Sequence, residues 1–223
     1  MAKQKKNIEE LPYKKVGWLY RFLKRSADIF FSLLLIIVLS PLLILIALIV
    51  WIASKGTPLF KDPRVGKDHK PINVLKFRTM YIDAETNIDK YLNRKQKKQW
   101  KKERKVQDDP RVTPIGKILR KTSLDELPQL FNIFLGSMSF VGPRPITEYE
   151  ITAYFSQEEQ KILLSTRPGL IGYWAVMGRS DVEFGSGKRQ QLELDYFKLR
   201  GIFFDISLIF RVIPAVLKGK GAK

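Results

Sequence analysis

The stretch "IFFSLLLIIVLSPLLILIALIVWIA", Ile29 to Ala53, contains no charged residue. At about 1.5 Å of rise per helical residue it is long enough to cross the roughly 30 Å hydrocarbon core of a bilayer. It is longer than the apolar region of a signal peptide, and no small-residue cleavage site follows it. We therefore expect a retained membrane helix over residues 29–53.

Ser40 and Pro41, at the centre of this stretch, argue against one straight span. Proline removes a backbone hydrogen bond and clashes with the preceding turn, so the sequence predicts a kink, and the serine hydroxyl could satisfy the freed carbonyl. Basic residues flank both ends, so the preference of positive charge for the cytoplasmic side does not indicate which end of the helix is cytoplasmic. A re-entrant helix that returns to the same face and a kinked single span both fit. The flanking residues are Lys14, Lys15, Arg21, Lys24 and Arg25 before the stretch and Lys55, Lys61, Arg64, Lys67 and Lys70 after it.

The composition indicates an anionic partner. The 223 residues suffice for one domain with an appendage, and 40 Lys and Arg against 22 Asp and Glu give a formal charge of +18. Phosphate, nucleic acid and an anionic bilayer all fit such a charge. The chain has no cysteine, which excludes disulfides and thiolate metal sites, and its one histidine, His69, lies in a loop-forming context typical of a surface residue.

The segments on either side of the apolar stretch carry their own patterns. Residues 1–28 predict a basic, partly amphipathic lead-in that rests on anionic headgroups. Residues 57–80 hold two short apolar runs separated by Pro, Gly and Asp, which indicates a β-hairpin. Residues 82–109 predict a polar helical stretch, in which Lys90 to Lys105 carries nine basic residues against one Glu. A solvated helix face and a membrane-surface contact explain that charge equally well.

The second half of the chain predicts short helices and loops. Residues 114–140 show near-helical spacing of apolar residues and predict two helices joined near "KTSLDE". Residues 139–147 and 165–181 are rich in Pro, Gly and Arg and predict loops. Residues 201–223 form an apolar run interrupted by charges, which favours an interfacial helix over a second span.

Two adjacent acids stand in "KTSLDELPQL", Lys121 to Leu130. Ser123 followed three residues later by Glu126 is a capping-box pattern, and Asp125 would then favour the positive end of the helix dipole. Pro128, however, would fall beyond the first turn and cost a helix bond. Structural and catalytic roles for the acids are therefore equally open at this point.

Arginines in Pro and Gly contexts surround these acids. Guanidinium donors match phosphate oxygens in pairs, so the set resembles a cradle for a diphosphate. Amid them, a carboxylate at a helix N-terminus would stay ionised and could bind Mg²⁺ or attack phosphorus. No Walker or dinucleotide fingerprint is present. The arginines are Arg111, Arg144, Arg167 and Arg179, with Arg120 one helical turn upstream of the acids.

The order of motifs resembles the monotopic polyprenyl-phosphate phosphoglycosyl transferases, also called bacterial sugar transferases. The resemblance runs from about Lys24 to near the C-terminus. It is carried by "KRSAD", the apolar segment with its central "SP", "RVGKDHKPINVLKFRTM", "DPRVTPIGKILRKTSLDELPQLFNIFLGSMSFVGPRP", "RPGLIGYWAVMGRSD" and "LELDYF". One departure stands out, because members often read "GxxQVxGR" where this chain has Ala175 and Met177.

The resemblance implies a reaction and a set of roles. The family transfers hexose-1-phosphate from a UDP-sugar to undecaprenyl phosphate through an aspartyl-phosphosugar intermediate, releases UMP and initiates exopolysaccharide or capsule synthesis. Asp125 matches its nucleophile and its likeliest Mg²⁺ ligand, and Glu126 completes the acid pair. The "GRSD" form of the loop favours galactose or glucose. Phosphate or substrate binding is expected from Lys76, Arg78, Arg120, Arg144, Arg167, Arg179 and Asp195.

We therefore expect an α+β, mainly helical fold: a re-entrant membrane helix broken at Ser40 and Pro41, interfacial amphipathic helices and a small β-hairpin around the active site. Residues 1–28 would form the lead-in, 29–53 the membrane helix and 54–223 the catalytic domain. The expected place is the bacterial inner membrane with the active site on its cytoplasmic face, in contact with anionic lipids and without nucleic acid. A monomer and a homo-oligomer are both compatible with the sequence. The competing hypothesis is a basic, non-enzymatic membrane module that binds nucleic acid or lipid, but it gives the acid pair no purpose.

Overall fold

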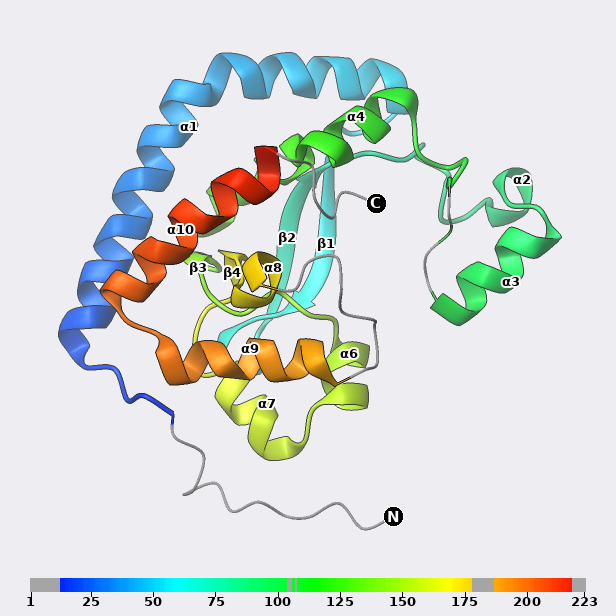
Figure 1. The fold of residues 1–223 in the computed structure, drawn as a ribbon. Coiled ribbons are helices and arrows are strands. Elements are labelled where there is room, and N and C mark those ends of the chain that lie inside the picture. Colours follow the sequence, from blue (N-terminus) through cyan, green and yellow to red (C-terminus); the bar gives the residue numbers. More distant parts are fainter. Residues whose placement is uncertain (1–12, 104–105, 107, 178–186, 218–223) are drawn as a thin grey trace, which may run out of the picture. The chain divides into compact units, whose positions relative to one another are not determined.

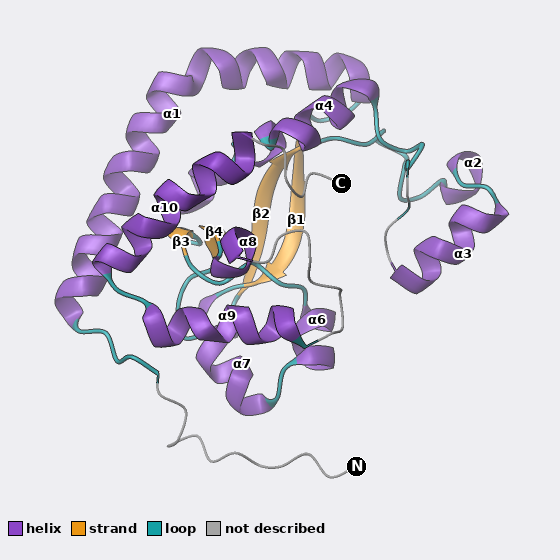
Figure 2. Cartoon of the chain, in the orientation of Figure 1, coloured by secondary structure: helices purple, strands orange, loops and turns teal. Residues whose placement is uncertain are grey.

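A computed structural model describes residues 13–103, 106, 108–177 and 187–217. Its contacts form two compact units, the first made of Met1–Ile36, Asp62–Val74 and Gln129–Gly221, the second of Ile37–Lys61, Leu75–Pro128 and Ala222–Lys223. Helices dominate and strands are few (Figures 1 and 2), which confirms the mainly helical α+β prediction. The elements are α1 Trp18–Ser54, β1 Leu59–Val65, η2 Lys67–His69, β2 Pro71–Phe77, α2 Ile88–Tyr91, α3 Arg94–Glu103, α4 Pro114–Thr122, η3 Leu124–Glu126, α5 Gln129–Leu135, β3 Ser139–Val141, α6 Glu148–Tyr154, α7 Gln157–Leu163, β4 Gly169–Ile171, α8 Tyr173–Met177, α9 Lys188–Leu199 and α10 Ile202–Leu217.

Helix α1 is one 37-residue element with Pro41 inside it. Proline at this position leaves the carbonyl of Ile37 without its usual N–H donor. The Ser40 hydroxyl donates to that same carbonyl at 2.8 Å, so the predicted compensation is confirmed. In the described part of the chain, α1 is the one helix long and apolar enough to cross a membrane.

The apolar side chains of α1 are largely exposed. Ile37 and Val38 are each 62% exposed, and Ile52 is 72% exposed. An apolar surface of this extent is unfavourable in water and is typical of a surface that contacts lipid. The helix also begins at Trp18, so residues 18–28 of the predicted lead-in belong to the same helical element.

The first unit is built around a core to which α6, α7, α9 and α10 contribute. Ile151, Tyr196, Phe197 and Leu208 are essentially inaccessible to solvent and pack in one cluster. Within this unit α8 lies against both α9 and α10, and α7 lies against α9 (Figure 1). The predicted C-terminal helix is thus confirmed as a helix, α10, and Leu208 places it in the core.

The prediction of loops over residues 139–147 and 165–181 is wrong for helix α8 and for strands β3 and β4. The two strands pair in parallel, with Ser139 opposite Gly169 and Val141 opposite Ile171. Runs of three residues are too short to show an alternating pattern, so the sequence does not reveal them. Gly169 permits the close approach, because a Cβ there would lie 2.1 Å from the backbone nitrogen of Gly142.

The second unit packs the C-terminal half of α1 against β2 and α4. Leu43, Ile46 and Val50 form its buried cluster with Phe77 and Leu119. The predicted hairpin is confirmed, since β1 and β2 form a two-stranded sheet joined by Gly66–Lys70. The polar stretch is helical as predicted, but it forms two helices, α2 and α3, separated at Leu92 and Asn93.

Candidate active site

The acid pair lies in a one-turn 3₁₀ helix, η3, between α4 and α5. The two predicted helices joined near "KTSLDE" are therefore confirmed. The capping box is wrong: Ser123 adopts a left-handed conformation, with φ at 58°, and ends α4, and its side chain caps nothing. Pro128 directly precedes α5 rather than lying inside a helix, so it costs no helix bond.

Asp125 has a raised pKa of about 6, against an ordinary value of 3.8. Burial is the largest cause, the neighbouring charge of Glu126 adds to it, and the nearby cations of Lys76 and Arg120 oppose both. Burial outweighs the effect of these cations, but a pKa of about 6 still agrees with the expectation that the carboxylate is ionised at neutral pH. At pH 7 and above the carboxylate is still mostly ionised, and it is a stronger base than an ordinary aspartate.

Two cations of the second unit face the acids. Lys76 comes from β2 and Arg120 from the last turn of α4, and both act electrostatically on Asp125. Arg120 is oriented by Thr79, whose hydroxyl accepts its Nε–H at 2.9 Å. The second unit thus brings together four of the predicted residues: Lys76, Arg120, Asp125 and Glu126.

Two other arginines of this unit have structural partners. Arg78 donates through Nε to the carbonyl of Thr57 at 2.8 Å and through a terminal nitrogen to the Thr57 hydroxyl at 2.9 Å. Arg111 is buried in a two-pronged ion pair with Asp109, at 2.6 Å for the closest contact. Neither guanidinium is among the largest electrostatic influences on the Asp125 carboxylate.

The first unit holds the "VGPRP" arginine. The backbone N–H of Arg144 donates to Glu193 at 3.0 Å, and its guanidinium lies 5.5 Å from the centre of the Trp174 ring. No ion pair or hydrogen bond engages that guanidinium within the described residues. Arg144 is therefore held in place with its side-chain donors available.

The remaining predicted residues have other surroundings. Arg167 donates to the carbonyl of Gly136, after α5, at 2.6 Å. Asp195 accepts from Lys198 at 2.6 Å and from Gln191 at 3.0 Å on the surface of α9. Arg179 lies outside the described residues.

Sequence reasoning missed two buried acids. Asp28, in "KRSAD", is 4% exposed and accepts the Phe140 N–H at 3.0 Å and the Ser139 hydroxyl at 3.2 Å. Glu193 is 2% exposed and accepts from Arg144. A signal for Glu193 exists, since it shares a helix face with buried Tyr196 and Phe197 at the spacing i, i+3, i+4.

The acid pair fits Mg²⁺ in one respect. Mg²⁺ in phosphate-transfer sites is held by one or two carboxylates together with the substrate phosphates. The charge of Glu126 raises the pKa of Asp125, so the two carboxylates repel each other. A cation bound between or beside them would relieve that repulsion. No group of three or more acidic or histidine side chains that could hold a metal by itself occurs in the described part of the chain.

Comparisons with known proteins agree on one family. The model of the bacterial sugar transferase family matches residues 19–219. The exopolysaccharide production protein ExoY of Sinorhizobium fredii is 39% identical over 201 residues, which are 89% of this chain and 87% of that protein. The undecaprenyl-phosphate galactose phosphotransferase of Salmonella typhimurium is 37% identical over 207 residues, 91% of this chain and 42% of that protein.

A further relative is the UDP-glucose:undecaprenyl-phosphate glucose-1-phosphate transferase of Escherichia coli K12, 37% identical over 198 residues, 86% of this chain and 40% of that protein. The chain thus spans most of ExoY and about two-fifths of the two longer enzymes. Because the family model covers nearly the whole chain and these relatives are named as sugar transferases, the protein is a transferase that belongs to the bacterial sugar transferase family.

Proposed function

We propose that this protein transfers hexose-1-phosphate from a UDP-sugar to undecaprenyl phosphate through a covalent aspartyl-phosphosugar intermediate and releases UMP. The observation that carries the proposal is the environment of Asp125: a half-buried carboxylate of raised pKa beside Glu126, with Lys76 and Arg120 near it. The names of the relatives support galactose or glucose as the sugar and undecaprenyl phosphate as the acceptor.

In the first step an oxygen of the Asp125 carboxylate attacks the sugar-linked phosphorus of the UDP-sugar. A bond forms between that oxygen and phosphorus, and the bond from phosphorus to the bridging oxygen breaks, so UMP leaves with the electron pair. Lys76 and Arg120 stabilise the negative charge that develops on the phosphoryl oxygens. The family resemblance assigns phosphate binding to Arg144 as well, and its guanidinium has donors suited to that role.

In the second step an oxygen of undecaprenyl phosphate attacks the same phosphorus. The bond to Asp125 breaks, the carboxylate is regenerated, and the hexose is left on a lipid diphosphate. If the incoming lipid phosphate carries a proton, Glu126 accepts it. Division into two steps keeps the two anionic substrates apart, because UMP leaves before the lipid phosphate enters.

Asp125, with Glu126 beside it, would hold a Mg²⁺ ion, and the substrate phosphates would supply its remaining ligands. When bound, that ion neutralises charge on the diphosphate. Lys76 and Arg120, in the same unit as the acid pair, would bind the phosphates.

The proposed place of reaction is the cytoplasmic face of the bacterial inner membrane, where a water-soluble nucleotide sugar meets a lipid phosphate. A re-entrant α1 would enter this face and leave through it, in contact with anionic lipids. The exposed apolar surface of α1 and the basic residues on both its flanks support this arrangement. The product would start an exopolysaccharide or capsule repeat unit, as the name of ExoY suggests for that protein.

The test is UMP release by purified protein with UDP-galactose or UDP-glucose, undecaprenyl phosphate and Mg²⁺. Asp125→Asn should abolish release, and wild-type protein given UDP-sugar and Mg²⁺ without the lipid phosphate should gain the mass of one hexose phosphate. The matched control is Asp68→Asn, an exposed aspartate at the tip of the β-hairpin in a left-handed conformation that asparagine also tolerates. Equal UMP release by Asp125→Asn and wild type would contradict the nucleophile, and no release from any UDP-sugar would contradict the function.

A further inference from the structure

Glu193 is a buried acid for which neither the proposed chemistry nor the family resemblance provides a role. It projects from α9 within the first unit, is 2% exposed and carries a raised pKa because it is desolvated. In the described part of the chain no cation lies within ion-pair distance of it. Burying a carboxylate without a paired cation is costly, so packing alone would favour an apolar side chain here.

The one hydrogen bond that Glu193 accepts goes to the backbone of the "VGPRP" loop. Pro143 and Pro145 have no N–H, so Arg144 supplies the single backbone donor of this tripeptide. That donor is bound by Glu193 Oε2 at 3.0 Å, while Glu193 Oε1 has no partner. The bond therefore fixes the main chain at the residue whose side chain is proposed to bind phosphate.

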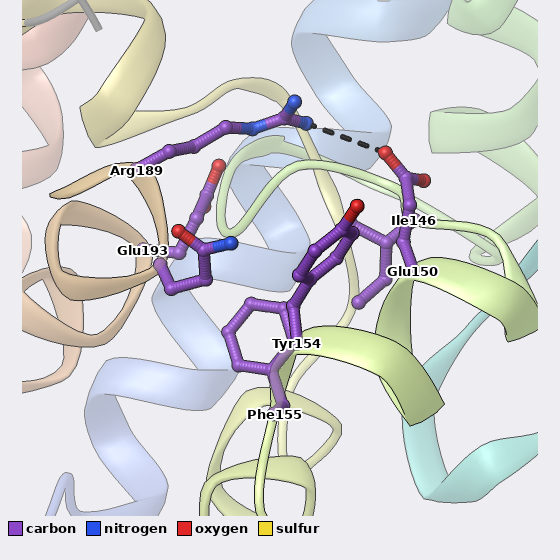
Figure 3. Close-up of a pocket in the computed structure, with 7 residues that line it drawn as sticks. Ile146, Glu150, Tyr154, Phe155, Arg189 and Glu193 are labelled. Carbon is purple, nitrogen blue, oxygen red and sulfur yellow. Dashed lines mark ion pairs between the residues drawn. The ribbon is translucent and has the colours of Figure 1, made fainter. Parts of the chain in front are cut away.

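The side chain of Arg144 is positioned separately, by Trp174. Its guanidinium lies 5.5 Å from the centre of that ring, and the guanidinium of Arg189 lies 4.5 Å from the same ring. Arg189 is itself largely buried and paired with Glu150 at 3.7 Å (Figure 3). Trp174 is thus a fixed platform for Arg144.

The space beside Glu193 is too small for a substrate. The cavity between α6 and α9 has a volume of ≈ 20 Å³, about the size of one water molecule, and Glu193 lines it together with Arg189 and Tyr154 (Figure 3). A hexose or a phosphate does not fit there. Glu193 therefore acts through Arg144 and does not touch the substrate.

We propose that Glu193 is a positioning residue, whose carboxylate holds the Arg144 main chain so that the Arg144 guanidinium, set against Trp174, meets a phosphate of the UDP-sugar or of the lipid. This inference rests on the proposed function and extends it to a residue outside the reaction centre. It predicts that the effect of changing Glu193 depends on Arg144 being present.

The experiment is a double-mutant cycle with Glu193→Leu, Arg144→Ala and the combined variant, measured as kcat/KM for UMP release. Glu193→Leu removes the acceptor and keeps the bulk, and it should lower kcat/KM about 10- to 100-fold in the wild-type background. With Arg144→Ala already present it should lower kcat/KM less than about twofold, because the group that it positions is gone. Glu193→Gln keeps an acceptor oxygen and should stay within about threefold of wild type.

Glu148→Leu, the same substitution at an exposed position of α6, is the matched control and should leave kcat/KM within about twofold of wild type. Circular dichroism and size exclusion in detergent report on folding of every variant. Equal losses from Glu193→Leu with and without Arg144 would overturn the proposal and make Glu193 a residue of the fold, and wild-type rates in Glu193→Leu would overturn it too. Absence of UMP release by wild type would instead contradict the proposed function, and the same cycle would then be measured by calorimetry of UDP binding.

Discussion

At the scale of single residues, Asp125 combines two properties that usually oppose each other. Its cationic neighbours, Lys76 and Arg120, attract anionic substrates, yet burial and Glu126 raise its pKa to about 6. A carboxylate with this pKa is a stronger nucleophile than an ordinary aspartate and is still ionised in most molecules at neutral pH. The desolvation that strains this residue in the free protein therefore favours its proposed chemistry.

The pH dependence of the first half-reaction should report this pKa. Only the ionised carboxylate attacks phosphorus, so the single-turnover rate of UMP release should fall about tenfold per pH unit below the pKa of Asp125, which is about 6 in the metal-free protein and lower once Mg²⁺ is bound. Glu126→Gln removes a charge that raises the pKa of Asp125, so the fall should move to lower pH in that variant. An unchanged profile in Glu126→Gln would show that another group controls the rate.

The same shift predicts that Asp125→Asn is more stable than wild type. A folded-state pKa of about 6 against 3.8 means that the folded protein binds more protons than the unfolded chain between these values, so stability is lost as pH rises through this window. Replacing the carboxylate should recover at most about 3 kcal/mol at pH 7 and nothing near pH 3. Thermal unfolding in detergent at both pH values measures this, and equal gains at both would contradict the electrostatic cause.

At the scale of elements, local patterns predicted helices better than their ends. Ser123 and Glu126 match a capping box, but Ser123 ends helix α4 and does not begin a helix. Leu119 of α4 packs in the buried cluster of the second unit, a tertiary contact that helps to position this helix. Among the described residues, capping boxes form at Thr147 and Ser156, which begin α6 and α7. A four-residue pattern does not say which helix it belongs to, and this is why the prediction failed.

The sequence indicated the acids, their flanking helices and the hairpin because each rests on contiguous residues. It did not indicate β3 and β4, three residues each, whose pairing joins positions 30 residues apart. Nor did it indicate the Arg144–Glu193 bond, which joins residues 49 positions apart. Contacts of that separation depend on the packed fold, and no local spacing encodes them.

The cap of α4 gives a test at this scale. Thr113 is fully buried, its hydroxyl accepts the Gly116 N–H at 3.0 Å, and it also contacts the carbonyl of Thr79 at 3.3 Å. Thr113→Ala should destabilise the protein by about 1–2 kcal/mol, because the cap is lost and a buried N–H is left unpaired. Thr113→Ser should retain most of the stability, measured by denaturant unfolding in detergent.

The control is Thr152→Ala in α6, whose exposed hydroxyl bonds only within its own helix. It should change the unfolding free energy by less than about 0.5 kcal/mol. If Thr113→Ala is equally mild, the start of α4 does not depend on this cap.

At the scale of the whole molecule, the proposed function requires one chain to bind both a lipid and a water-soluble substrate. The charge of +18 and the apolar surface of α1 are opposite requirements that an interfacial protein satisfies together. Basic residues on both flanks of α1 favour one membrane face for both ends. The Ser40–Ile37 hydrogen bond shows how the helix tolerates proline, and it is compatible with either topology.

Topology is open to a clean experiment because the chain has no cysteine. Single cysteines at Lys15 and Lys61, exposed residues on the two sides of the apolar stretch, report each flank, and one at Lys117, exposed on α4 in the unit that holds Asp125, reports the catalytic part. If α1 is re-entrant from the cytoplasm, an impermeant maleimide should label none of the three in cells with an intact inner membrane and all three after permeabilisation. Labelling of one flank alone in intact cells would establish a spanning helix. The Lys117 cysteine would then tell which flank shares its side with the active site, and under the proposed function that side is the cytoplasmic one.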